Sequence, residues 1–239
     1  MQLCSVLRFS SQLFGGARGE LADSLQQRGK ISDRVPKTAG ASNLLLGGRL
    51  QLKIRSCMTD IASLPPIRRV VTANDDQGRS YFCEDGPSPA IRYVAERPGY
   101  RITNLWRTEG SPAEVSAPDS ISAHTGVEPP AGGTVLRILD IPPEPADPLE
   151  LEKALNATFS KMYGDAHRDV KPGEHPGMHR TESVDYALML EGELVAILDK
   201  EETVLRAGDV LIQRGTTHAW ANRSGKPARI AFVLVSGKY

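Results

Sequence analysis

The sequence predicts an all-β domain, a sandwich or barrel that also contains one helix, and two patterns carry that prediction. Short runs rich in Val, Ile, Tyr and Phe alternate with clusters of Gly, Pro, Asn and Asp, which favour turns. The last third of the chain contains six such runs in rapid succession, joined by connections of only a few residues. Strands this short and this closely spaced favour a sandwich or barrel over a parallel α/β sheet.

The expected strands form two groups along the chain. The first group comprises residues 67–72, 80–83, 90–94, 100–106 and 134–141. The second comprises residues 185–190, 194–198, 202–205, 210–213, 218–222 and 228–235. Residues 109–133 are rich in Pro, Ser, Ala and Gly and show no period, which predicts a long loop or flap.

One helix is expected between Pro148 and Tyr163. Asp147 is suited to the N-cap, Pro148 to the first helical position and Glu150 to the third. An apolar stripe at helical spacing follows, made of Leu151, Leu155, Phe159 and Met162. We interpret this stripe as a packing face and not as a cofactor site.

Composition argues against several classes of partner. The 239 residues include 29 Lys and Arg and 29 Asp and Glu, so the overall charge gives no reason to expect nucleic acid or an anionic membrane. No run of 18 apolar residues is present, which excludes an ordinary transmembrane helix. The three cysteines have no disulfide or zinc spacing, and this favours a reducing compartment and a cytoplasmic location.

The basic residues are concentrated at the start of the chain. Residues 1–57 contain nine basic and three acidic side chains and are interpreted as a poorly structured extension or a targeting segment. A mitochondrial presequence, a disordered tail, a basic surface arm and an upstream extension ahead of a start at Met58 all remain open. Residues 58–239 are expected to form one domain, with its core barrel at about 134–239.

A spaced motif lies ahead of the second group of strands. Gly173, His179, Thr181, Asp185 and Gly192 are separated by five, one, three and six residues. This spacing resembles the first signature of the cupin superfamily, G-x5-H-x-H-x3/4-E-x6-G. Thr181 takes the place of the second histidine of that signature, and Asp185 takes the place of the glutamate.

A second motif follows at residues 208–222. It contains Gly208, Gly215, His218 and Asn222, and it resembles the second cupin signature, G-x5-P-x-G-x2-H-x3-N. Gln213 occupies the proline position, and the spacing from Gly208 is one residue short. The two motifs in this order imply a cupin fold, the double-stranded β-helix or jelly-roll barrel, with additional N-terminal strands and one short helix.

The resemblance implies at most three protein ligands for a metal ion: His179, Asp185 and His218. Two imidazoles and one carboxylate suit a divalent metal, Fe(II) in the first place, with Mn, Ni or Zn as alternatives. Asp185 is one methylene shorter than glutamate, and a salt bridge to Arg180 or a turn-capping role is the alternative for it. His179 and His218 are also candidate catalytic groups.

Strand alternation supplies the remaining candidates. Thr181 shares a strand face with His179, so its hydroxyl is expected in the pocket as a catalytic group that orients substrate or water. Trp220 shares a face with His218 and is expected to form a pocket wall, with core packing as the alternative. Tyr186 and Met189 are candidate substrate contacts, with barrel filling as the alternative.

A narrower resemblance suggests the activity. The segments HRTESVDYALMLEGEL and LRAGDVLIQRGTTHAWAN resemble small bacterial and fungal cupins that share HRT-x-[ST]-x-DY and GD-x5-RG-x2-HAW-x-N. The fungal members are called cupin-domain oxidoreductases and occur in gene clusters for polyketides and related secondary metabolites. The resemblance therefore implies a metal-assisted oxidoreductase that acts on a small polyketide-like intermediate. A homodimer is expected as well, because cupins commonly pair through barrel edges and the strands at residues 67–106 would otherwise leave an edge exposed. A redox-neutral cyclase, dehydratase, isomerase or decarboxylase, and a non-catalytic small-molecule-binding barrel, are the alternatives.

Overall fold

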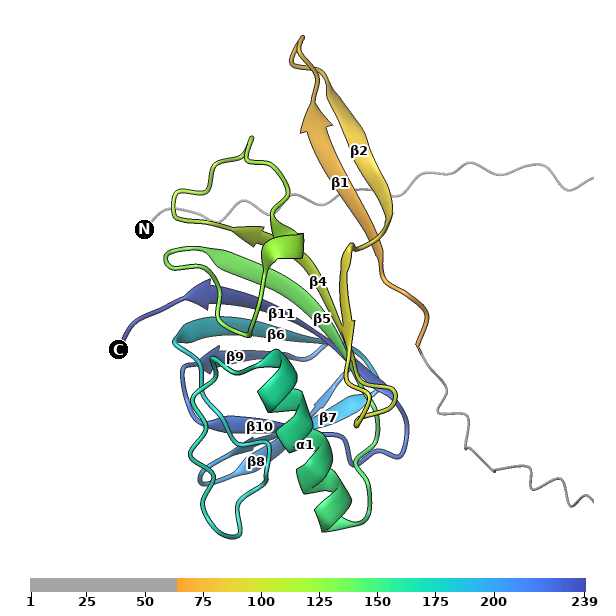
Figure 1. Cartoon of the computed structure of the whole chain (residues 1–239), viewed down its shortest axis with the longest axis vertical. Coiled ribbons are helices and arrows are strands. Elements are labelled where there is room, and N and C mark those ends of the chain that lie inside the picture. Colours follow the sequence, from red (N-terminus) through yellow and green to blue (C-terminus); the bar gives the residue numbers. More distant parts are fainter. Residues whose placement is uncertain (1–63) are drawn as a thin grey trace, which may run out of the picture. The chain divides into compact units, whose positions relative to one another are not determined.

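A computed structural model describes residues 64–239, so the expectations for residues 1–57 lie outside the described part of the chain. The described residues form strands joined by turns, with one α-helix and one short 3-10 helix (Figure 1). The strands are β1 (Arg68–Asn74), β2 (Ser80–Pro87), β3 (Ala90–Tyr93), β4 (Arg101–Thr108), β5 (Thr134–Ile141), β6 (Ser183–Glu191), β7 (Glu193–Leu198), β8 (Glu202–Arg206), β9 (Val210–Arg214), β10 (His218–Ala221) and β11 (Ala228–Ser236). Every expected strand is present, and the all-β fold class is confirmed.

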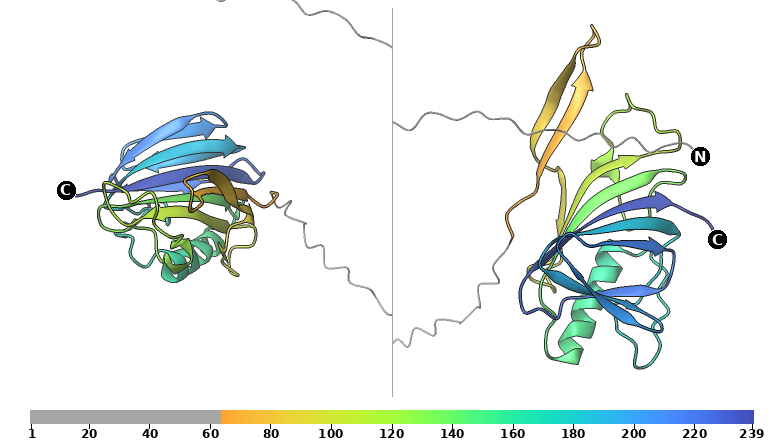
Figure 2. Two further views of the ribbon diagram at one scale, coloured as in Figure 1. Left: turned by 90° about the horizontal axis from the view of Figure 1, so that it is seen from above. Right: turned by 180° about the vertical axis from the view of Figure 1, so that it is seen from behind.

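Two antiparallel sheets face each other and form the barrel (Figures 1 and 2). The larger sheet has six strands in the order β3-β4-β5-β11-β6-β9, and the smaller has three in the order β10-β7-β8. Strand β11 pairs with both β5 and β6 and so lies in the middle of the larger sheet. This sheet includes β3 and β4, so the barrel begins before residue 134.

Strand β6 shows why the sequence pattern dictates the barrel. Its odd-numbered residues from Ser183 to Met189 are buried, whereas Val184, Tyr186 and Leu190 are exposed. Successive side chains of a strand point to opposite faces, so one register places all the buried residues of β6 in the barrel. The core between the sheets includes Val135, Ala187, Leu194, Ile230 and Leu234.

Helix α1 (Pro148–Met162) covers one side of the barrel (Figure 1). The side chain of Asp147 accepts a hydrogen bond from the Leu149 amide (3.0 Å), and Pro148 occupies the first turn, as the sequence predicts. Leu155 and Phe159 are buried in the core, so the apolar stripe does pack against the barrel. No helix in the described range is long and apolar enough to cross a membrane.

The connection between β4 and β5 is the expected long loop, interrupted only by the 3-10 helix η1 (Ile121–Ala123). Ile121, His124 and Val127 are buried. The loop is therefore packed against the barrel over this stretch and closes part of the interior.

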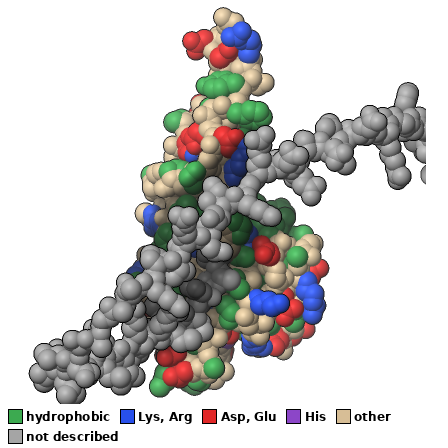
Figure 3. Space-filling model, turned by 90° about the vertical axis from the view of Figure 1, so that its right-hand side faces the viewer, with side chains coloured by type: hydrophobic (Ala, Val, Ile, Leu, Met, Phe, Trp, Pro, Cys, Tyr) green, Lys and Arg blue, Asp and Glu red, His purple; other side chains and the backbone are tan. Residues whose placement is uncertain are grey.

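Strands β1 and β2 form a separate hairpin that projects from the barrel (Figure 1). Hydrophobic and charged side chains are interspersed along it in Figure 3, and Tyr81 and Phe82 are exposed. At its base the buried Arg69 guanidinium donates to the Leu105 carbonyl (3.1 Å) and to the Asp119 carboxylate (2.6 Å). These bonds join the hairpin to β4 and to the long loop.

Candidate functional site

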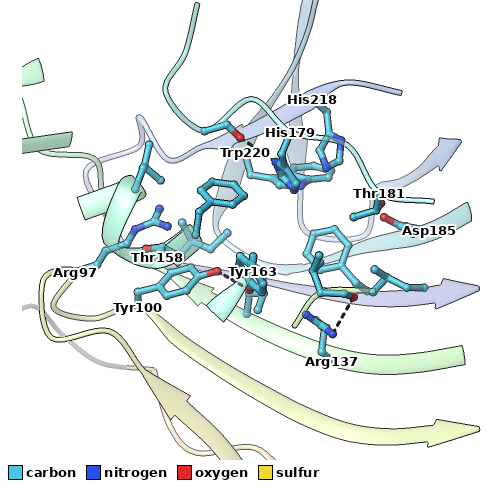
Figure 4. A pocket seen from close by; sticks show the side chains of 18 residues that line it. Arg97, Tyr100, Arg137, Thr158, Tyr163, His179, Thr181, Asp185, His218 and Trp220 are labelled. Carbon is cyan, nitrogen blue, oxygen red and sulfur yellow. Dashed lines mark hydrogen bonds between the residues drawn. The ribbon is translucent and has the colours of Figure 1, made fainter. Parts of the chain in front are cut away.

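A pocket of about 70 Å³ lies in the barrel between the two sheets and helix α1 (Figure 4). The larger sheet contributes residues of β5, β6 and β11, the smaller sheet contributes residues of β10, and α1 closes one side. One water molecule needs about 10–15 Å³ of such space, so the pocket has room for a small ligand. Its walls are largely apolar, with a few polar groups among them, as in most small-molecule sites.

Two of the expected residues, His179 and His218, lie side by side in this pocket (Figure 4). Their backbones form an antiparallel bridge, in which each amide donates to the other residue's carbonyl at 2.9 and 2.8 Å. The two rings are 4.3 Å apart between centroids and tilted by 45°. The bridge brings together two imidazoles that are 39 residues apart in the sequence.

Backbone carbonyls fix the tautomer of both rings. His179 Nδ1 lies 2.8 Å from the Gly177 carbonyl, and His218 Nδ1 lies 3.0 Å from the Thr216 carbonyl. A carbonyl only accepts, so both Nδ1 atoms donate and both Nε2 atoms keep a free lone pair. Burial lowers the pKa of His179 to about 4 and that of His218 to about 3, so both rings are neutral near pH 7.

A polar chain from Thr181 to Asp185, at the start of β6, forms a second part of the pocket. Ser183 Oγ lies 2.8 Å from Thr181 Oγ1 and 2.5 Å from Asp185 Oδ1. A hydroxyl has one proton, so Ser183 donates to the carboxylate and can accept from Thr181. Burial raises the pKa of Asp185 to about 6, against the lowering effect of the Ser183 bond and the Arg137 charge.

The fit of a metal ion differs between the expected ligands. Both imidazoles fit, because each presents a free Nε2 and is oriented through Nδ1, as metal-binding histidines are. Asp185 lies beside Thr181 and is apart from the two rings in Figure 4. Within residues 64–239, no three His, Cys, Asp or Glu side chains are grouped so that they could hold a metal ion. The described residues therefore do not form a three-ligand centre, and metal binding stays a prediction.

Of the three expected substrate contacts, Trp220 lines the pocket, whereas Tyr186 and Met189 do not. Trp220 lines the pocket, 5.5 Å from the His218 ring and 5.2 Å from Phe232 between centroids. Tyr186 does not line it: its side chain is 46% exposed on the outer face of β6, since the neighbouring Asp185 points inward. Met189 is buried in the core outside the pocket lining, so it fills the barrel.

Several lining residues were not expected from the sequence: Arg97, Tyr100, Arg137, Thr158, Phe159 and Tyr163. Tyr100 and Tyr163 share a hydrogen bond between their hydroxyls (2.9 Å). The stripe of α1 thus lines the pocket as well as packing, and only the tertiary fold reveals this. For Arg137 the sequence does contain a signal, because a cation stands at a core-facing position of an apolar strand.

One further histidine, His175, lies outside the pocket lining. His175 follows a loop sequence typical of an exposed side chain, yet it is largely buried and its Nε2 lies 2.9 Å from Glu144 Oε1. It is therefore not an exposed loop histidine.

Comparison with known proteins agrees with this architecture. The family model described as "Cupin domain" matches residues 166–235. A relative from Diaporthe leptostromiformis, "Phomopsin biosynthesis cluster protein C'", is 32% identical over 71% of this chain and 78% of its own length. The chain belongs to the cupin-domain family. The match to the family model includes both histidines of the pocket.

Two further comparisons concern this cupin. "Cupin-domain-containing oxidoreductase fogC" from Aspergillus ruber is 29% identical over 73% of this chain and 75% of its own length. The solved structure of a Cupin 2 conserved barrel domain protein from Salinispora arenicola has a TM-score of 0.31 and 14% identity, over 60% of this chain and 82% of that one.

Proposed function

We propose that this cupin is an oxidoreductase that acts on a small, largely apolar, oxygenated intermediate of secondary metabolism. The observation that carries the proposal is the pair of neutral imidazoles, His179 and His218, which present two free Nε2 atoms inside a largely apolar pocket. The names of the fungal relatives, which include cupin-domain-containing oxidoreductases and biosynthesis cluster proteins, support the kind of reaction and the kind of substrate.

The imidazole pair is suited to removing a proton from the substrate. A neutral ring with a free Nε2 accepts a proton from a hydroxyl or from a carbon beside a carbonyl. The Nδ1 bond to a backbone carbonyl keeps each ring in the required tautomer and stabilises the imidazolium that forms. His179 and His218 are therefore the proposed catalytic residues.

The surrounding residues are suited to positioning the substrate. Trp220, Phe159 and Phe232 supply aromatic walls that exclude water from the imidazoles. The Thr181 hydroxyl and the Asp185 carboxyl line the pocket at the start of β6, where they can bond an oxygen of the substrate. Thr181 keeps the orienting role that the sequence suggests for it.

The proposal is tested by incubating the purified full-length chain with a panel of aromatic alcohols, aldehydes, hydroquinones and hydroxy acids under air, with dioxygen as the electron acceptor, followed by mass spectrometry. We expect products that have lost two hydrogens or gained oxygen, and we expect His179→Asn and His218→Asn to lose at least about 100-fold in rate. The matched control is His167→Asn, because His167 is exposed and lies outside the pocket. Turnover that survives both pocket substitutions contradicts the proposal.

Metal analysis of the same preparations addresses the predicted cofactor. Stoichiometric iron or manganese that is lost in His179→Asn, together with activity, supports a metal held by the imidazoles. An active protein without bound metal supports the redox-neutral alternative, in which the imidazoles act as acid–base groups. Tight binding of a panel compound without turnover indicates a binding protein.

A redox-neutral reaction is the second candidate, and one observation favours it. The neutral imidazoles lie across the pocket from Asp185, whose raised pKa of about 6 lets its carboxyl gain or lose a proton near neutral pH, so three groups suited to proton transfer share the pocket. A cyclase, dehydratase, isomerase or decarboxylase can use proton transfer of this kind. Products at the substrate's oxidation level, with deuterium taken up from heavy water, identify this case.

A further inference from the structure

Arg137 is a buried cation in the pocket that the proposed chemistry leaves unused. It lies in β5, opposite Phe232 of β11, and faces the barrel interior together with the apolar residues of the same strand face. Its side chain is 2% exposed and lines the pocket. Burying a cation there costs free energy unless an anion compensates its charge and acceptors bond its N–H groups.

Only one of the three guanidinium nitrogens has hydrogen-bond partners in the described part of the chain. Nη2 lies 2.8 Å from His124 Nε2 and donates to the carbonyls of Val127 (3.1 Å) and Gly126 (3.4 Å). Nε and Nη1 have no hydrogen-bond partner in the part of the chain that the structure describes.

All the groups bound by Nη2 are neutral. Two are backbone carbonyls, and burial lowers the pKa of His124 to about 4, so this ring carries no charge near pH 7. Asp185 also lines the pocket and is within range of the Arg137 charge, but no hydrogen bond or ion pair joins the two side chains. Among residues 64–239, Arg137 thus forms no ion pair, whereas the buried Arg229 donates to the Asp140 carboxylate.

The cation and the imidazoles lie on opposite walls of the pocket. Arg137 projects from the six-stranded sheet, whereas His218 belongs to the three-stranded sheet and His179 bridges to it. Figure 4 shows Arg137 at a distance from both rings. A ligand between the sheets can therefore have one end at the guanidinium and the other at the Nε2 atoms.

We infer that Arg137 binds an acidic oxygen of the ligand, so that the substrates of this pocket are small, largely apolar carboxylic acids or ionised enols. An anionic oxygen at Nη1 supplies the missing acceptor and compensates the buried charge in one interaction. The acid end then holds the molecule while its other end lies at the imidazoles. This inference rests on the proposed function and adds the substrate class to it.

The test compares an acid with its neutral amide in the full-length protein. Calorimetry at pH 7 measures the affinities of salicylate and salicylamide, which share ring and hydroxyl but differ in charge. We expect the wild type to prefer salicylate, and Arg137→Gln to lose this preference by weakening salicylate roughly 10- to 100-fold while salicylamide changes little. Retained amide binding shows that the variant pocket is intact.

Arg206→Gln serves as the matched control, because Arg206 is exposed and lies outside the pocket lining. This control is expected to keep the preference for the acid. If Arg137→Gln proves unstable, Arg137→Lys retains the charge without the guanidinium donors, and it is expected to show an intermediate preference.

Each other outcome overturns the inference. Equal binding of acid and amide by the wild type, or equal weakening of both by Arg137→Gln, shows that Arg137 only tethers the loop at residues 124–127. In both cases the pocket still takes an oxygenated molecule, so the proposed function stands. Failure of the wild type to bind salicylate removes the acid site, and the turnover experiment with the His179 and His218 variants then decides the proposed function separately.

Discussion

The buried arginines of this barrel differ in whether a carboxylate compensates their charge. The Asp140 carboxylate accepts from the Arg101 guanidinium (2.7 Å) and from the Arg229 guanidinium (2.6 Å), and all three side chains are largely buried. Arg137 has no such partner within the described chain. The first arrangement is complete without a ligand, whereas the second leaves donors free in the pocket.

Asp140→Asn removes the shared anion of two buried cations. We expect the free energy of unfolding to fall by about 3–5 kcal/mol, because Arg101 and Arg229 are left without a compensating charge. Urea denaturation monitored by circular dichroism measures the change. Asp85→Asn is the control, since the Asp85 pair with Arg68 is exposed and solvent-screened and should change stability far less. Equal effects of the two substitutions would show that the Asp140 cluster adds no special stability.

His124 links stability to pH. The unfolded chain binds a proton on this ring with a pKa near 6.5, whereas burial and the Arg137 charge lower the pKa in the folded state to about 4. Between these values the unfolded state binds more protons, so the stabilising contribution is lost as the pH falls. We expect the wild type to lose up to about 3 kcal/mol relative to His124→Gln between pH 7 and pH 4. Parallel pH profiles of the two melting temperatures would contradict this.

Helix α1 connects the packing of the barrel to the shape of the pocket. Phe159 packs edge-on against the His179 ring at 4.9 Å between centroids, and Arg168 lies 4.3 Å above the Phe159 ring. The helix therefore positions one of the proposed catalytic imidazoles while it buries its own apolar face.

Phe159→Ala should affect both roles of α1. We expect a loss of about 3–5 kcal/mol of stability from the cavity, together with a lower turnover rate because the His179 ring loses its neighbour. Denaturation and the turnover assay measure the two effects. Leu149→Ala in the same helix is the control, because Leu149 is exposed and should change stability by less than about 0.5 kcal/mol. A similar small effect for Phe159→Ala would contradict this role.

The elements themselves could be predicted because local patterns specify them. Asp147 and Pro148 mark the start of α1, and the alternation along residues 183–190 marks β6 with its correct face. The approach of His179 to His218 followed from two motifs with a known spacing. The role of α1 as a pocket wall did not follow, since periodicity cannot distinguish a packing face from a pocket wall. The placement of Asp185 apart from the imidazoles depends on side-chain direction, which strand alternation alone does not give.

In the molecule as a whole, the outer surface of the larger sheet exposes apolar side chains along one edge. Strand β9 is one edge of that sheet, and its outward residues Val210 and Ile212 are exposed next to Val184 and Tyr186 of β6. Exposed apolar side chains at an unpaired edge favour association with another chain. This is the surface on which we expect the predicted homodimer to form.

Acidic substitutions at this surface should weaken the dimer. We expect analytical ultracentrifugation to show a dimer for the wild type, and the double substitution Tyr186→Glu with Ile212→Glu to weaken it at least about tenfold. Tyr93→Glu is the control, because Tyr93 is similarly exposed but lies in β3 at the opposite edge of the sheet. A monomeric wild type, or a dimer that only the control disrupts, would contradict this placement.

The central position of β11 has a consequence for biosynthesis. Its residues, up to Ser236, separate β5 from β6, so each of those strands lacks one of its two neighbours until β11 has left the ribosome. Until then the nascent chain carries two parts of the larger sheet, each with an unpaired edge that is prone to aggregation. Premature termination shortly before residue 228 should release a product that cannot close its barrel and is degraded.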